Sequence, residues 1–204
     1  MIPGIRAQWA AVPPDGLMTV EELMALPEDR WRYELVAGRL VKRLPTDVLH
    51  DMIARVLVAA LQTFARTSGA GGIVVMESGA LVSAEGEPAT IFVPALGYVR
   101  AEHISTEGSP SELPSVRVVP DLVVEIATPG MQRPEMAERA RVWLAAGAQV
   151  VWAVLPAYRQ VDIWRAGPDT AAPAPEMVTR SMHESIEADP ALPGFNYPVA
   201  HLFS

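Results

Sequence analysis

The 204-residue sequence contains no cysteine. Its absence excludes a disulfide framework, a thiolate zinc site and a cysteine nucleophile together. The chain also lacks any basic run of five or more residues, and its formal net charge is −8. Because phosphate binding depends on Lys and Arg displacing counterions, this balance argues against a large non-specific nucleic-acid surface. It does not exclude a nuclease, whose metal-binding carboxylates add negative charge.

Several other signals are missing. No run approaches the roughly 18 apolar residues expected of a membrane helix. Residues 1–16 show no long apolar core behind a basic start, so they do not resemble a signal peptide. We therefore expect a cytoplasmic protein without a membrane partner. Phosphate-binding loops, dinucleotide fingerprints and nucleophile elbows are also absent, and the four histidines are too scattered for a zinc site.

What is present is the composition of a globular protein, with 50% hydrophobic and 20% charged residues. Residues 1–17 are rich in Pro, Ala and Gly and predict a flexible tail, which leaves 18–204 as one domain. The order of elements predicts a mixed α/β fold. Helices are expected at 19–26, where Thr19 and Glu22 form a capping-box pattern, from Thr46 or Asp47 as the cap to about 67, and at 134–146. Strands are expected at 31–36, 39–43, 73–76, 80–83, 91–93, 96–99, 118–126, 150–154 and 160–164, and the first two form a hairpin around Ala37-Gly38. Residues 101–117 predict a surface loop, and the region after 164 predicts Pro-rich loops with short apolar pieces.

The most informative segment is Pro-Asp-Leu-Val-Val-Glu at 120–125. Asp121 and Glu125 are four residues apart on the predicted strand, so their side chains lie on one face. Carboxylates are rarely buried unless they are paired or bound to a metal, and Mg²⁺ prefers such oxygen ligands. The alternative is that both residues lie at the strand's ends and are only solvated.

A sequence of short segments carries a resemblance. RYELVAGRLV comes first, then a helix that bears His50, then PDLVVEIATPG, a helix ending in WLAAGA, QVVWAVLP, VDIWR and LPGF. Together they resemble the putative restriction endonuclease family, whose core is the PD-(D/E)XK nuclease fold. The resemblance covers roughly residues 18–204. It implies a restriction-endonuclease-like mixed β-sheet flanked by helices, and a homodimer.

The resemblance also implies a metal-dependent phosphodiesterase centre. Asp121, Glu125 and Glu34 would hold Mg²⁺ or Mn²⁺, which would polarise a phosphate of nucleic acid, most simply DNA. Two positions depart from the family. Pro94-Ala95 stands where Pro-Asp is common, and counting back four residues from Trp143 gives Arg139 where the family has lysine. Arginine cannot deprotonate, so this replacement is not conservative.

Two hypotheses follow. In the first, the protein is an Mg²⁺-dependent endonuclease with a partly degenerate site, in which Glu34, Asp121, Glu125 and Arg139 are catalytic. In the second, it is a catalytically inactive nuclease-fold protein kept as a binding or assembly module. Three local alternatives also stay open. Glu34 could be a surface charge paired with Arg32 or Arg39, His50 could be a cap or core residue, and Trp143 is most simply core.

Overall fold

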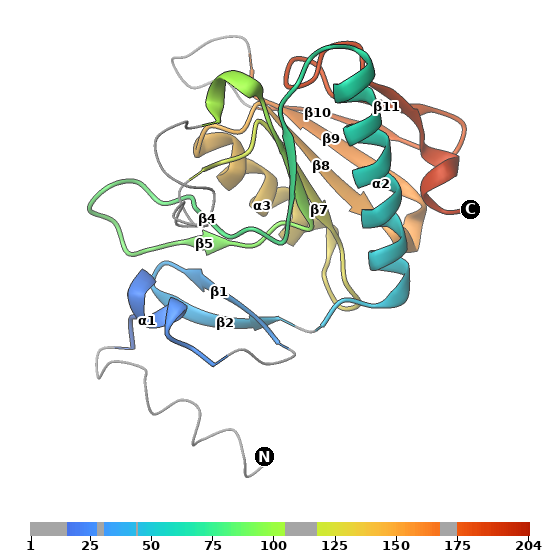
Figure 1. The fold of residues 1–204 in the computed structure, drawn as a ribbon. Coiled ribbons are helices and arrows are strands. Elements are labelled where there is room, and N and C mark those ends of the chain that lie inside the picture. The colour runs from blue at the N-terminus through green and yellow to red at the C-terminus, as the bar shows by residue number, and fades with distance from the viewer. Residues whose placement is uncertain (1–15, 28–30, 44, 105–117, 168–174) are drawn as a thin grey trace.

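The structure is a computed structural model that describes residues 16–27, 31–43, 45–104, 118–167 and 175–204. Within these ranges the chain is a mixed α/β fold in which two long helices flank a central sheet, as predicted (Figure 1). The tail predicted over 1–17 lies outside the described residues except for its last two. The loop predicted at 101–117 is described only as far as residue 104.

The central sheet has six strands in the order β10-β9-β8-β7-β6-β3. Only β7 and β8 run parallel, and the other neighbours are antiparallel. Every residue of β7 and β8 is buried, as expected for parallel strands covered on both faces. The strands are β3 (Ile73–Met76), β6 (Leu96–Val99), β7 (Leu122–Ile126), β8 (Val150–Leu155), β9 (Gln160–Arg165) and β10 (Glu176–Arg180).

The helices α2 (Val48–Thr67) and α3 (Arg133–Ala145) cover opposite faces of this sheet (Figure 1). Successive side chains of a strand point to opposite faces. On β7, Val124 and Ile126 accordingly belong to the core cluster that includes α2, whereas Val123 belongs to the cluster that includes α3. Odd-numbered residues of β7 therefore face α3.

Local signals in the sequence explain where these helices begin and end. The Asp47 side chain accepts a 2.8 Å hydrogen bond from the backbone N–H of His50, so Asp47 is the N-cap of α2. Pro134 lies in the first turn of α3, where its missing N–H costs nothing. Gly147, with a φ of +112°, follows the end of α3 in a conformation that favours glycine.

A smaller sheet, in the order β2-β1-β5-β4, combines the N-terminal hairpin with two short strands from the middle of the chain (Figure 1). Its predicted hairpin is present, and both turn residues, Ala37 and Gly38, have positive φ, as two-residue hairpin turns require. A short helix precedes it, with the Thr19 and Glu22 capping box that the sequence predicts. The elements are α1 (Val20–Met24), β1 (Arg32–Val36), β2 (Arg39–Arg43), β4 (Ala80–Leu81) and β5 (Ile91–Phe92).

The structure corrects the sequence prediction in two places. The strand predicted at 118–126 begins only at Leu122. The C-terminal region, interpreted as loops with short apolar pieces, contains β10 and a two-stranded sheet of β11 (Ser185–Glu187) and β12 (Asn196–Pro198).

The helix α2 is apolar and long enough, by length and composition alone, to cross a membrane. The helix is not an unbroken apolar run, because Asp51 and Arg55 interrupt it. Its residues Ile53, Leu57 and Leu61 have no exposed surface and lie in a core cluster with residues of the central sheet. Only 33% of its most apolar window is buried, so burial accounts for part of its apolar composition.

Candidate active site

Three buried charged side chains meet where the small sheet approaches the central sheet. Glu34 comes from β1, Glu125 from β7 and Arg139 from the middle of α3. They are 1%, 5% and 4% exposed. Charged residues are almost never buried this completely unless they are paired. We call this group the Glu-Arg-Glu centre.

The guanidinium of Arg139 bridges the two carboxylates. Its Nη1 and Nη2 donate to the two oxygens of Glu34, each at 2.9 Å. Its Nη2 and Nε also donate to Oε1 of Glu125, at 2.7 and 3.1 Å. The contact with Glu34 is bidentate, the strongest arrangement that arginine and a carboxylate can form. Arg139 is therefore held on both sides by negative charge.

Neighbouring side chains complete this arrangement. The indole Nε1 of Trp143 donates to Oε1 of Glu125 at 2.7 Å. The ring of Phe92 lies 4.1 Å from the guanidinium carbon of Arg139, in a cation–π contact. Arg43 donates to Glu34 at 2.8 Å and to Glu135 at 2.6 Å, which ties the hairpin to the first turn of α3. The backbone N–H of Val93 donates to Glu34 at 2.9 Å.

The pKa values follow from these contacts. Burial alone would raise the pKa of Glu34, but the charge and hydrogen bonds of Arg139 outweigh it and hold the pKa below its ordinary value. Burial alone would lower the pKa of Arg139, and the charges of Glu125 and Glu34 outweigh it and raise that pKa. Arg139 is therefore a permanent cation, and Glu34 is ionised at neutral pH.

Asp121 does not lie in this centre. It precedes β7 and faces the same side as Glu125, as the even spacing predicted, but four residues of extended chain separate the two by about 13 Å. Its carboxylate accepts hydrogen bonds from the backbone N–H of Arg100 at 2.8 Å and from Gln149 at 3.0 Å, and it contacts the ring of His103 at 2.8 Å. The structure therefore does not bring Asp121 and Glu125 together, and their shared binding of a metal ion stays a prediction.

The remaining predicted residues take definite places. Glu34 pairs with Arg139 and Arg43, rather than with Arg32 or Arg39 as a surface charge would. Ala95 is 2% exposed, and its N–H donates to the carbonyl of Val124 at 3.0 Å, one residue before Glu125.

His50 is buried near the start of α2, where its Nδ1 lies 3.3 Å from Asp51 and burial lowers its pKa. Its side chain makes no hydrogen bond to the Glu-Arg-Glu centre. The structure thus favours the interpretation of His50 as a core residue.

Sequence reasoning missed three contributors to the centre. Trp143 is a core residue, as expected, but it also donates to Glu125. Its position four residues after Arg139, one helical turn away, is the signal that both side chains share a face of α3. Arg43 lies nine residues from Glu34 in the predicted hairpin, whose register brings the two side chains together, whereas Phe92 gave no signal because it reaches the centre through pairing with a distant segment.

The residues of the centre do not fit a divalent metal as they stand. Mg²⁺ binds oxygen ligands in near-octahedral geometry, whereas here the two facing carboxylates are held by a guanidinium that cannot lose its proton. Position 95, an alanine, contributes no carboxylate to this region. Across the described part of the chain, no group of three His, Asp or Glu side chains is arranged to hold a metal ion.

The fold and this centre define a nuclease-like α/β domain. A family model described as putative restriction endonuclease, Uma2, matches residues 20–200. The chain therefore belongs to the putative restriction endonuclease family, as its sequence predicted. The solved structure of a putative nuclease belonging to DUF820 from Anabaena variabilis has the same fold, with a TM-score of 0.72 at 16% identity over 91% of this chain and 97% of that one. No curated protein sequence matches the chain.

Proposed function

We propose that this protein is a catalytically inactive member of the nuclease family, which binds nucleic acid without hydrolysing it. The observation that carries the proposal is the position of Arg139 between Glu34 and Glu125. The family resemblance implies a metal ion beside these carboxylates, and in this chain the Arg139 side chain pairs with both of them. Family membership supports nucleic acid, most simply DNA, as the bound molecule.

The energetics support this assignment. A metal ion would have to displace a guanidinium that donates four hydrogen bonds of 2.7 to 3.1 Å inside a buried site. Hydrogen bonds between charged groups are each worth about 1.5–3 kcal/mol. The displaced Arg139 would also lose the Phe92 ring that covers it. Because Ala95 provides no carboxylate, the binding of a divalent cation is weakened further.

The competing candidate is a metal-dependent endonuclease with an impaired centre. One observation favours it: Glu34 and Glu125, which lie far apart in the sequence, converge on one point, as a shared metal ion would require. In that case Arg139 would have to leave the carboxylates when metal and substrate bind. The two candidates therefore make opposite predictions about divalent cations.

Metal titration and a cleavage assay on the same samples separate the candidates. We expect wild-type protein to leave supercoiled plasmid and single-stranded DNA intact in Mg²⁺ or Mn²⁺. In calorimetry, wild type and Glu125→Gln should give the same heat on addition of Mn²⁺, because neither binds it. The double variant Ala95→Asp/Arg139→Lys restores both family residues, and we expect it to bind Mn²⁺. Cleavage by the wild type that Glu125→Gln abolishes would establish the endonuclease instead.

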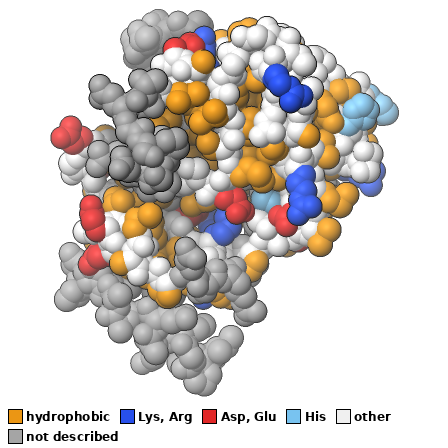
Figure 2. Space-filling view, in the orientation of Figure 1, with side chains coloured by type: hydrophobic (Ala, Val, Ile, Leu, Met, Phe, Trp, Pro, Cys, Tyr) orange, Lys and Arg blue, Asp and Glu red, His pale blue; other side chains and the backbone are white. Residues whose placement is uncertain are grey.

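We propose further that the protein is a cytoplasmic homodimer. The exposed edge of the central sheet supports the dimer, because β3 is its last strand among the described residues. Ile73 and Met76 of β3 are 45% and 48% exposed, and Met52 of α2 is 48% exposed. Hydrophobic side chains gather on the surface between β3 and α2 (Figure 2). Sedimentation of wild type and Ile73→Arg tests this: a dimer that uses the edge should dissociate when the charge is introduced.

A further inference from the structure

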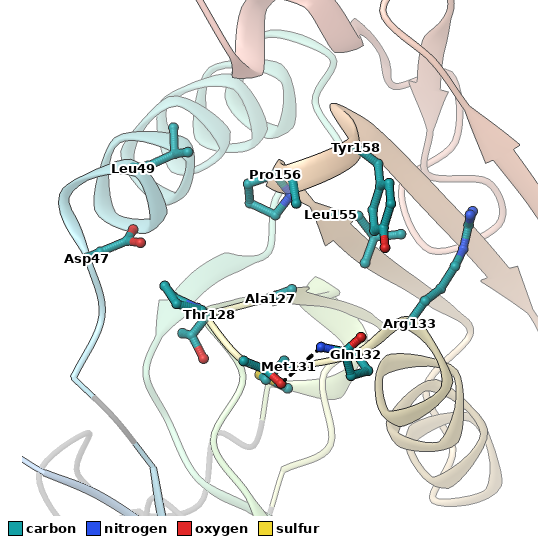
Figure 3. Close-up of a pocket in the computed structure, with 13 residues that line it drawn as sticks. Asp47, Leu49, Ala127, Thr128, Met131, Gln132, Arg133, Leu155, Pro156 and Tyr158 are labelled. Carbon is teal, nitrogen blue, oxygen red and sulfur yellow. Dashed lines mark hydrogen bonds between the residues drawn. The ribbon is translucent and has the colours of Figure 1, made fainter.

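A pocket of about 370 Å³ borders the connection between β7 and α3, the two elements that carry Glu125 and Arg139 (Figure 3). Three segments form it: the start of α2, the connection between β7 and α3, and the turn that follows β8. It therefore opens at the carboxyl ends of the two parallel strands, where α/β folds commonly bind their ligands. Its volume lies in the range of small-molecule sites.

The walls of this pocket are mostly apolar. Leu49, Leu155 and Pro156 line it, and the ring of Tyr158 stands at its rim with 60% of its surface exposed. Asp47 reaches toward the pocket from the start of α2, opposite Tyr158 (Figure 3). These groups offer a surface for stacking and a hydrogen-bond acceptor for the edge of a flat ligand.

A phosphate group does not suit this pocket. Its one guanidinium, that of Arg133, is already bound to Asp162 through Nε at 2.8 Å and to Thr179 through Nη2 at 3.0 Å. The carboxylate of Asp47 would repel an anion. The lining thus favours an uncharged aromatic ring that carries hydrogen-bond donors, which describes a nucleobase with an exocyclic amine.

The pocket and the centre share two elements. Ala127 lines the pocket and follows Glu125 by two residues, about 7 Å along an extended chain. On α3, Arg133 borders the pocket, and Arg139 lies within the centre. A nucleotide whose base entered the pocket would therefore bind against the same two elements that carry the buried centre.

From these observations we infer that the pocket binds one unpaired nucleobase, stacked on Tyr158 with its amine edge toward Asp47. This inference rests on the proposed function and specifies its ligand as single-stranded nucleic acid. A paired base cannot enter such a pocket without being unstacked, which costs free energy. The protein should accordingly prefer single strands to duplexes.

The test measures fluorescence anisotropy of a labelled 12-nucleotide DNA, as a single strand and as a duplex. We expect Tyr158→Ala to weaken single-strand binding about tenfold, the usual order of effect for losing one stacked base. Tyr158→Phe should bind as the wild type does, because the stacking face remains. Met24→Ala, which removes an exposed apolar side chain far from the pocket lining, on α1, is the matched control and should leave the affinity for the single strand unchanged.

A second titration, of adenosine followed by amide NMR signals of residues 127–133, keeps the two proposals separate. If Tyr158→Ala binds the single strand as tightly as the wild type, the pocket assignment is overturned and the proposed function stands. If adenosine shifts these signals in a Tyr158-dependent way but no DNA or RNA strand binds, the pocket stands and the proposed function fails. If neither ligand binds, both fail.

Discussion

The two ends of β7 carry carboxylates on the same face, and their surroundings differ in almost every respect. Glu125, at one end, faces a buried guanidinium, an indole N–H and the second carboxylate of Glu34. Asp121, at the other, faces a backbone N–H, an amide and a histidine that is 51% exposed. Identical chemistry on one strand thus gives a charge-paired centre at one end and a hydrogen-bonded anchor at the other.

The difference teaches that burial alone does not mark a functional carboxylate. Both residues are about equally buried, at 4% and 5% exposed. What separates them is the partner: Glu125 is neutralised by a full charge, whereas Asp121 fixes the backbone that follows β6 (Leu96–Val99). The proposed loss of metal binding therefore concerns the Glu125 end alone.

The largest effect should come from removing the shared cation. Arg139→Ala leaves Glu125 buried with only the indole N–H of Trp143 and leaves Glu34 with Arg43, and breaking a buried pair in this way costs about 3–5 kcal/mol. Urea denaturation measures the loss in the free energy of unfolding. Arg141→Ala, on the same helix, removes an exposed pair with Glu138 and a 5.2 Å cation–π contact with Trp164, and serves as the matched control. Equal losses in both variants would show that Arg139 does not stabilise the fold by pairing with buried carboxylates.

A smaller effect should appear in the dependence of stability on pH. Because the pKa of Glu34 is lowered in the folded protein, its contribution is complete above the ordinary carboxyl value of 4.5 and is lost as the pH falls through the folded pKa. Glu34→Gln removes this contribution. Urea midpoints of wild type and variant should therefore differ at pH 7 and approach each other below pH 4.5.

One outcome would contradict this prediction, and one variant serves as its control. A constant difference across the whole range would mean that Glu34 stabilises the fold through shape rather than charge. Glu138→Gln, which changes an exposed carboxylate on α3, should leave both the midpoints and their slope with pH almost unchanged.

Sequence patterns predicted the scaffold better than the centre. The hairpin around Ala37 and Gly38 and the N-cap at Asp47 are local signals, and the structure has both. The short strands β10 to β12 were missed, because they are three to five residues long and have no strong periodicity, although each pairs with a neighbouring strand in the sequence. Local propensity carries little information about such strands.

Glu34 and Arg139, which only the family resemblance supplied, meet at Glu125, whereas Asp121, which even spacing linked to Glu125, lies apart from them. Glu34 and Arg139 are 105 residues apart, and no periodicity links them. For Asp121, the even spacing correctly predicted the face of the strand but carried no information on distance along it. Whether a carboxylate on β7 joins the centre depends on which helix and which hairpin pack at its end of the strand.

The smallest effect should come from the Asp121 end. Asp121→Ala leaves the backbone N–H of Arg100 and the amide of Gln149 without their acceptor, which costs about 1–3 kcal/mol. His103→Ala removes the half-exposed partner of the same carboxylate and should cost under about 1 kcal/mol. Because Asp121 lies outside the Glu-Arg-Glu centre, neither variant should alter Mn²⁺ binding by Ala95→Asp/Arg139→Lys when the changes are combined. If Asp121→Ala abolishes that binding, the two ends of β7 act as one site, and the division between them is wrong.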